Sequence, residues 1–443
     1  MKITPKTIAD FFRLGSLPGD PRGVFLRHEY DKHEPRFRKL AAFYRQHFLS
    51  RTRIVTVIGS LGKTSTRQAV ALALNCPDRN FSHYNARASV PGNLLRLRRR
   101  DRHGVIEVSV GMPGKMEARA RMIRPDIVVV TSVKSDHHSI FPTLLDTRQE
   151  KVKMLTVMGE NGIAILNGDD ENVRWMATQT RARVVTFGMN SDNDIRATKI
   201  DVNEDGTASF EIQVAGATFH FQSPLVGRHM VYPVLAAVAV AHVEKMDIAA
   251  ILPKLAHVPP AVSRMEWHKL PNGIRILDDS FKASPESVDA AVETFSKMTG
   301  RKIVVMGKID EPVGKARDRY RELGERLAKF SDFLLCIGGN ELTSMRAAAV
   351  AAGMDVSTIK VLGSRIDGAH EWLQSILKPG DLVLLKGSIN QKLRRILFQL
   401  MGKPVACRIK FCGVKVRTCD DCPLLNAPES FYRNSFVSPY IKL

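Results

Sequence analysis

Short apolar runs alternate with longer segments of mixed polarity over residues 53–260. Runs rich in β-branched residues predict buried strands of a parallel sheet at 54–58, 104–108, 127–131 and 162–166. Residues 194–222 instead alternate polar and apolar positions around the turn Asn203-Glu-Asp-Gly206, a pattern typical of antiparallel strands. This part of the chain is therefore expected to form an α/β domain with a parallel sheet and an antiparallel addition.

A second alternating pattern follows the Pro259-Pro260 pair, which marks a domain boundary. Its expected strands lie at 275–277, 303–306, 333–337 and 382–385, with helices between them. The predicted organisation is a short basic segment, two α/β domains and a small tail rich in cysteine, at 1–52, 53–260, 261–400 and 401–443.

The first segment is predicted to be helical, because Phe37, Leu40, Tyr44 and Phe48 recur at helical spacing with basic residues between them. One interpretation is a helix packed on the neighbouring domain. The alternative is an interfacial helix that contacts anionic lipid peripherally.

The net charge of +21 changes this picture little, since the lysines and arginines are spread over all 443 residues. That spread favours attraction to small anionic ligands, and no nucleic acid is expected. The sequence shows no apolar run near the ~20 residues that cross a bilayer. It shows no secretory signal either, and we expect a cytoplasmic protein.

A glycine-rich loop follows the strand expected at 54–58 and precedes a helical segment at 67–74. This strand–loop–helix order is the context of a phosphate-binding loop, in which backbone N–H groups and the helix dipole hold phosphates. Lys63 is expected at the β/γ phosphates of ATP and the Thr64 hydroxyl on Mg²⁺. The predicted nucleotide-binding residues are Gly59, Ser60, Gly62, Lys63, Thr64 and Ser65.

Further short motifs follow the loop in a fixed order. They are Glu107 at a strand end, Ser135-Asp-His-His138, Lys151, Asn167-Gly-Asp-Asp170, Arg264 in Ser263-Arg-Met-Glu266, Asp278 to Pro285, Met306-Gly307 with Glu311, and Lys386-Gly-Ser388. In this order they resemble the Mur ligase family over residues 53–395, and most closely the members that add D-alanyl-D-alanine to UDP-N-acetylmuramoyl-tripeptide. The resemblance implies a central P-loop ATPase domain and a Rossmann-like C-terminal domain.

The resemblance also implies chemistry, in which a carboxylate attacks the ATP γ-phosphate and an amine captures the acyl phosphate. Glu107, His137 and a carbamylated Lys151 would hold Mg²⁺ with Thr64, while Arg264 and Asp279 would contact the nucleotide. Lys386 and Ser388 would meet the incoming substrate. Simpler interpretations stay open for these residues. Glu107 could be a surface glutamate and His137 a structural histidine. Lys151 could be a solvent-facing helix lysine beside Lys153, and the aspartates could cap turns.

The chain departs from the family pattern at several positions. Met230 and Pro233 stand where the family has asparagines near the adenine, which puts adenine recognition in doubt. Only about 52 residues precede the expected ATPase domain, whereas muramyl ligases carry a uridine-binding domain there. The carboxylate donor is therefore expected to be held in another way, as a sugar acid, a lipid-linked precursor or a growing peptide.

Four of the six cysteines lie within sixteen residues near the C-terminus, at Cys407, Cys412, Cys419 and Cys422. The spacing predicts a structural Zn²⁺ site, with an iron–sulfur cluster or unliganded thiols as alternatives.

The sequence thus predicts an ATP-dependent ligase that joins a small-molecule or glycan-linked carboxylate to an amine or amino acid, in cell-envelope or capsular glycan synthesis. A ligase of the folylpolyglutamate-synthase kind is the enzymatic alternative. The non-catalytic alternative is an ATP- and zinc-containing protein that binds nucleic acid or a partner.

Overall fold

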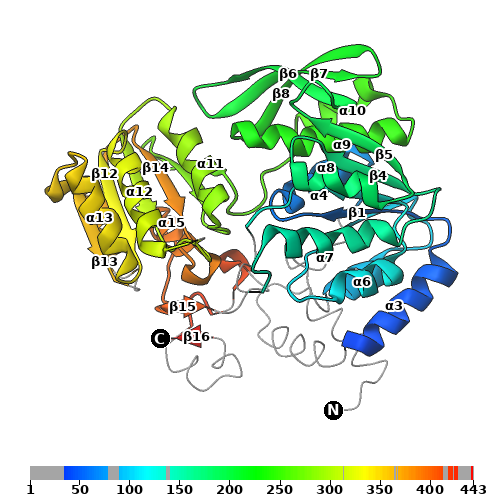
Figure 1. The fold of residues 1–443 in the computed structure, drawn as a ribbon. Helices are drawn as coiled ribbons and strands as arrows, with labels where there is room; N and C mark the ends of the chain where they lie inside the picture. Colours follow the sequence, from blue (N-terminus) through cyan, green and yellow to red (C-terminus); the bar gives the residue numbers. More distant parts are fainter. Residues whose placement is uncertain are drawn as a thin grey trace. The chain divides into compact units, whose positions relative to one another are not determined.

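The computed structural model describes residues 34–77, 89–135, 140–312, 314–363, 366, 368–412, 418–422, 424–427 and 441–442. The chain divides into two compact units at Ala261/Val262, and the described residues of each form an α/β sandwich (Figure 1). The predicted α/β fold class is confirmed. Among the described residues, no helix combines the length and the apolar character that crossing a bilayer requires.

The unit His28–Ala261 is built on a sheet with the order β2-β1-β3-β4-β5-β6-β7-β8. The first six strands run parallel, and β7 and β8 continue antiparallel beyond them, as the sequence predicts. Strand β5 was not predicted, because half of its residues are not buried and its apolar run is short. The bounds are β1 Arg53–Ile58, β2 His103–Glu107, β3 Ile127–Val130, β4 Ile163–Asn167, β5 Arg183–Gly188, β6 Ile195–Val202, β7 Thr207–Val214 and β8 Ala217–Val226.

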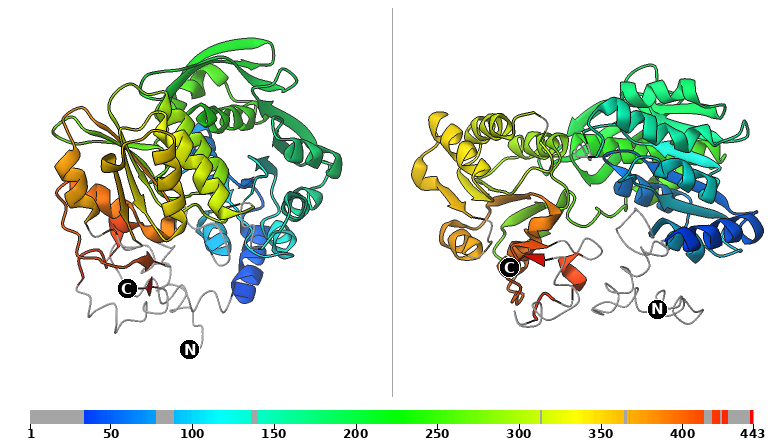
Figure 2. Two further views of the ribbon diagram at one scale, coloured as in Figure 1. Left: turned by 60° about the vertical axis from the view of Figure 1, so that its left-hand side comes forward. Right: turned by 60° about the horizontal axis from the view of Figure 1, so that its bottom comes forward.

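Helices cover both faces of this sheet (Figures 1 and 2). On one face α4, α9 and α10 pack on one another, and on the other face the side chains of α3 and α5–α8 share a core with alternate strand residues such as Ile54 and Ile58. The bounds are α3 Glu34–Phe48, α4 Lys63–Ala73, α5 Ser89–Arg96, α6 Lys115–Ile123, α7 Leu144–Thr156, α8 Glu171–Met176, α9 Val231–Val243 and α10 Ile248–Leu255.

The predicted N-terminal helix is α3, and it packs on α5 and α6. Its Arg45 is buried and donates hydrogen bonds to the carbonyl oxygens of Ile123 and Thr52, each at 3.0 Å. Leu40, Phe43 and Phe48 are exposed. Helix α3 therefore packs on the neighbouring helices, as the first of the two interpretations expects. Its peripheral contact with lipid stays a prediction.

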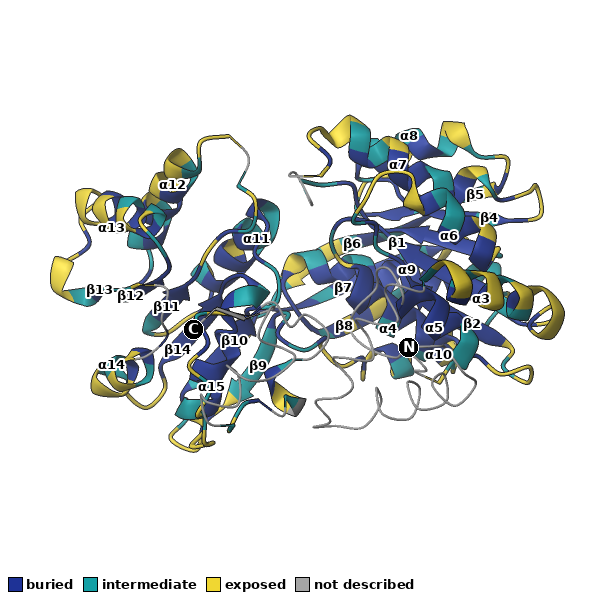
Figure 3. Cartoon of the chain, turned by 90° about the horizontal axis from the view of Figure 1, so that it is seen from below, coloured by how far each residue is buried: buried dark blue, intermediate teal, exposed yellow. Residues whose placement is uncertain are grey.

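The second unit, Val262–Leu443, has the sheet order β13-β12-β11-β14-β10-β9, parallel except for β9. The central strands β10, β11, β12 and β14 are mostly buried, whereas α12 and α13 turn exposed faces outward (Figure 3). Helices α14 and α15 share one core with the sheet and with Cys419. The bounds are β9 Glu266–Lys269, β10 Arg275–Asp279, α11 Pro285–Ser296, β11 Lys302–Met306, α12 Ala316–Ala328, β12 Phe333–Ile337, α13 Glu341–Ala351, β13 Ile359–Leu362, α14 Ala369–Ile376, β14 Leu382–Lys386, α15 Arg394–Leu400, β15 Phe411–Cys412 and β16 Ile441–Lys442.

Candidate functional site

The glycine-rich loop connects β1 to α4 at the carboxyl edge of the sheet. Gly59 has φ +143°, and a Cβ there would lie 2.0 Å from Thr131 Oγ1, so a larger residue cannot take this position without a shift. The segment after β3 holds the loop: Ser60 N–H donates to Ser132 O at 2.8 Å, and Thr131 Oγ1 donates to Leu61 O at 2.6 Å. The backbone path of the loop is therefore fixed by hydrogen bonds within the protein.

Lys63 begins α4, and Gly62 at φ +79° turns the chain into that helix. The Lys63 ammonium folds back over the loop and donates to Gly59 O at 2.8 Å and Ser60 O at 2.6 Å. A phosphate in the loop would meet this ammonium together with the positive end of the α4 dipole. Ser65 follows in the first turn and is buried.

Thr64 and Glu107 come together although 43 residues separate them in the sequence. Parallel pairing places Glu107 opposite Val57, so the end of β2 lies beside the start of the loop. Thr64 Oγ1 donates to Glu107 Oε1 at 3.1 Å, and Arg67 Nε lies 3.8 Å from the other carboxylate oxygen. A hydroxyl and a carboxylate are the hard oxygen donors that Mg²⁺ prefers, so this pair fits that ion.

The Asn167–Asp170 turn supports the same edge from β4. Asn167 Nδ2 donates to Thr131 O at 2.8 Å, and Asp170 Oδ2 accepts from Val133 N–H at 3.0 Å. Lys134 Nζ lies 3.3 Å from that aspartate oxygen. The Asn167–Asp170 turn thus holds the segment after β3, and that segment in turn bonds to the glycine-rich loop. Only the strand register reveals this support, because the residues involved are 36 or 37 positions apart.

Lys151 lies on α7 and is only 3% exposed, which argues against the solvent-facing alternative. Its neighbour Lys153 donates to Glu150 Oε2 at 2.6 Å. Glu150 in turn accepts the N–H groups of Gly114 and Met116 at the start of α6, at 3.0 and 2.8 Å. Lys153 is therefore part of a structural cap, and Lys151 is the buried lysine of the pair. His137 lies outside the described residues.

In the second unit, Asp279 and Lys386 form a buried ion pair at the ends of the neighbouring strands β10 and β14. Lys386 is 0% exposed and also donates to Lys282 O at 2.7 Å and Ser287 Oγ at 3.2 Å. Ser388 is buried, and its Oγ accepts from Asn390 N–H at 3.4 Å. In this geometry Lys386 holds the segment after β10 in place.

Arg264 projects from a bend in which both neighbours, Ser263 and Met265, have positive φ, at 54° and 50°. Such backbone costs on the order of 1–3 kcal/mol per residue unless the surroundings hold it. Asp279 Oδ1 accepts from Met265 N–H at 3.2 Å and supplies part of that support. The Arg264 guanidinium lies 3.9 Å from the centre of the Phe281 ring.

Comparison with known proteins decides the family. The model of the Mur ligase middle domain matches residues 57–241, and that of the Mur ligase glutamate ligase domain matches residues 263–389. Together they cover most of the chain. The chain belongs to the Mur ligase family.

Individual relatives of this Mur ligase agree with the family models. The UDP-N-acetylmuramoyl-tripeptide--D-alanyl-D-alanine ligase of Escherichia coli K12 is 28% identical over 367 residues, covering 78% of this chain and 80% of the relative. Two solved MurF structures share the fold. The Acinetobacter baumannii enzyme has a TM-score of 0.75 at 21% identity, covering 84% of this chain and 81% of that one. The Thermotoga maritima enzyme, solved with ADP, has a TM-score of 0.71 at 22% identity and covers 84% of both chains.

The segment in which Met230 and Pro233 replace the family's asparagines contains a contact that the sequence did not predict. Tyr232, between Met230 and Pro233, donates from Oη to Asp169 Oδ2 at 3.0 Å. Burial and the nearby carboxylate Asp169 raise the pKa of Tyr232 above its ordinary value, so the phenol stays neutral and can serve as a donor. Met230 and Pro233 are buried. The segment is therefore tied to the Asn167–Asp170 turn.

A second network that was not predicted lies around Arg394. Its guanidinium bonds to Asp278, to Glu266 at 2.8 Å and to Asp420 at 2.7 and 2.8 Å. Glu266, His268 and Asp278 have a ligand spacing that could suit a metal ion, but Arg394 already provides the cation there. Burial acts to raise the pKa of Glu266, but hydrogen bonds from His268 and Ser263 N–H and the charge of Arg394 lower it to about 2.

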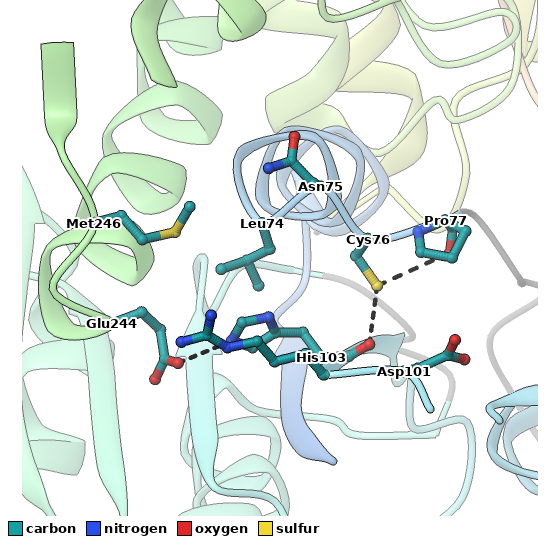
Figure 4. Close-up of a pocket in the computed structure, with 9 residues that line it drawn as sticks. Leu74, Asn75, Cys76, Pro77, Asp101, His103, Glu244 and Met246 are labelled. Atoms are coloured by element: carbon teal, nitrogen blue, oxygen red, sulfur yellow. Dashed lines mark hydrogen bonds and ion pairs between the residues drawn. The ribbon is translucent and has the colours of Figure 1, made fainter. Parts of the chain in front are cut away.

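A cavity of about 280 Å³ lies at the opposite edge of the first sheet (Figure 4). Glu244 pairs there with His103 at 2.9 Å and with Arg53, the first residue of β1, at 2.7 Å. Cys76 Sγ donates to His103 O at 3.1 Å. Because the glycine-rich loop follows the last residue of β1, whereas this cavity lies at the first residues of β1 and β2, the cavity is separate from the candidate active site.

Proposed function

We propose that this Mur ligase joins a carboxylate to an amine with ATP through an acyl-phosphate intermediate, in the synthesis of a cell-envelope polymer. The observation that carries the proposal is the pairing of Thr64 with Glu107 beside the Lys63 loop. A phosphate cradle with an adjacent hydroxyl–carboxylate pair is what phosphoryl transfer from a Mg²⁺ nucleotide requires.

The reaction has two steps. A carboxylate oxygen of the first substrate attacks the γ-phosphorus, and the bond to the bridging oxygen breaks, so that ADP leaves. The amine nitrogen of the second substrate then attacks the acyl carbon, loses a proton and expels inorganic phosphate. That phosphate carries away the oxygen that the carboxylate contributed.

The residues of this chain contribute binding and charge. The loop N–H groups and Lys63 hold the β/γ phosphates and offset the charge that develops as ADP leaves. Thr64 and Glu107 would hold Mg²⁺, which supplies Lewis-acid polarisation of the phosphoryl group when bound. A carbamate on the buried Lys151 would add a further anionic ligand for that ion, and His137 would add a neutral one. Arg264 and Asp279 stay predicted nucleotide contacts, and Lys386 and Ser388 predicted substrate contacts.

We propose a peptide-bearing carboxylate and an amino acid or dipeptide as the substrates, by analogy with the relatives named for a muramoyl tripeptide and D-alanyl-D-alanine. Adenine recognition would differ from theirs, because Met230 and Pro233 offer no side-chain hydrogen bond.

The test uses the full chain, ATP and Mg²⁺ with pooled carboxylates and amines, among them UDP-N-acetylmuramoyl-tripeptide, folate-type acids and D-alanyl-D-alanine. We expect phosphate release that needs both substrates, and with an ¹⁸O-labelled carboxylate one label should appear in each phosphate. Lys63→Ala should abolish release, whereas the exposed Lys115→Ala should not. Phosphate without label, or no substrate-dependent release from any pool, would refute the mechanism.

A further inference from the structure

The four C-terminal cysteines converge in the fold of the second unit, although they come from separate segments. Cys407 precedes β15, Cys412 ends β15, Cys419 begins the single 3₁₀ turn Cys419–Asp421, and Cys422 follows that turn. All four line one small cavity of about 20 Å³. Space of this size suits one ion or one water molecule and no organic ligand.

The cysteines are held by the core of the unit. Cys419 belongs to the apolar cluster that contains α14 and α15, and Cys412 is also buried. The backbone N–H groups of Ala406 and Cys407 both donate to Leu425 O, at 3.0 and 2.9 Å. These contacts bring the Cys407 segment beside the Cys419–Cys422 turn, so the placement of the four cysteines around one cavity is a built feature of the fold.

Two buried cations face the same cavity. Lys392 and Arg395 line it with the cysteines, and each is less than 9% exposed. Arg395 lies 3.3 Å from Cys407 Sγ and donates to Cys407 O at 2.8 Å and Ile409 O at 2.7 Å. Four thiolates around a divalent cation carry a net charge of −2, which these two side chains would offset.

We propose that Cys407, Cys412, Cys419 and Cys422 bind one Zn²⁺ ion. Soft thiolate ligands in a set of four favour tetrahedral Zn²⁺, and a complete set leaves no position for a reacting water, so the role is structural. Both family matches end before Cys407, and the site is thus an addition to the Mur ligase core.

Hydrogen bonds also connect the cysteine site to residues of the family motifs. Asp420, inside the Cys-x2-Cys turn, accepts two hydrogen bonds from Arg394, which in turn bonds to Asp278 and Glu266. Zinc binding therefore orders the turn that holds Arg394, and Arg394 holds the strand end on which Asp279 lies.

The first test measures metal in the untagged, full-length chain by elemental analysis. We expect one zinc per chain. Replacing zinc with Co²⁺ should give the visible bands and thiolate charge transfer of a tetrahedral thiolate site. The double variant Cys419→Ser/Cys422→Ser should lose the metal, and Cys76→Ser, which changes a cysteine of the other unit, should keep it.

A strong chelator should remove zinc from the wild-type chain and lower its melting temperature, with recovery on adding Zn²⁺. This measurement keeps the proposal testable if the cysteine variants do not fold. A folded chain without metal, an iron centre in place of zinc, or cysteines oxidised to disulfides would each overturn the proposal. None of these outcomes bears on the ligase reaction, which is measured separately by phosphate release.

Discussion

The Thr64 hydroxyl donates a hydrogen bond to the Glu107 carboxylate at 3.1 Å, and this contact joins the phosphate loop to the end of the neighbouring strand β2. Both side chains are almost fully buried. Their oxygen atoms lie together in an arrangement that suits a hard cation, and this arrangement supports the assignment of the loop to phosphoryl transfer.

Replacing Glu107 by Gln tests that arrangement. The amide oxygen can still accept from Thr64, but the negative charge that would hold Mg²⁺ is lost. We expect kcat for phosphate release to fall on the order of 10- to 100-fold, and the Mg²⁺ concentration for half-maximal activity to rise. The matched control is Glu117→Gln, an exposed carboxylate of the same unit. Equal Mg²⁺ dependence in both variants would exclude Glu107 as a ligand.

A methyl group at Gly59 should damage the loop itself. Gly59→Ala places Cβ against Thr131 Oγ1 at a φ that favours glycine. We expect about 1–3 kcal/mol of lost stability in urea unfolding, together with loss of nucleotide binding. Gly111→Ala is the control, because a Cβ there meets nothing within 4 Å. Unchanged ATP affinity in Gly59→Ala would mean that the loop does not contact phosphate.

Lys151 and Lys153 distinguish a carbamate from a structural lysine. Lys151→Ala should abolish phosphate release, and added acetate should restore part of it by supplying the missing carboxylate. Lys153→Ala should keep its activity and lose stability instead, because it removes the ion pair with Glu150. If acetate has no effect on Lys151→Ala, or if that variant stays fully active, the carbamate is refuted.

The lowered pKa of Glu266 predicts how the free energy of unfolding changes at acid pH. Its pKa in the folded chain is about 2, against an ordinary value of 4.5. A lowered carboxyl pKa stabilises the fold above the ordinary value, and this stabilisation is lost as the pH falls from about 4.5 towards 2. Urea unfolding at pH 7 and pH 3 should therefore show a smaller pH dependence in Glu266→Gln than in wild type. A Glu266→Gln chain with the same pH dependence as wild type would contradict the pairing with Arg394, His268 and the Ser263 N–H.

Much of the fold follows from local pattern alone. The buried runs at β1, β3 and β4 are apolar and β-branched, and the Gly59–Thr66 loop stands directly between a strand and a helix. Such signals act over a few residues, so they can be read without the tertiary structure. Strand β5 was not predicted, because its own apolar pattern is weak and the neighbouring strands stabilise it.

The sequence by itself determined the α/β class, the glycine-rich loop between a strand and a helix, and the family, because each depends on short motifs of neighbouring residues. Only the tertiary structure decided that Lys151 rather than Lys153 is buried, that Glu107 meets Thr64, and that Arg394 connects the cysteine turn to Asp278. These relationships depend on strand register and helix packing between residues far apart in the chain. Hydrophobic spacing predicts that such elements exist, but it does not specify which side chains they bring into contact.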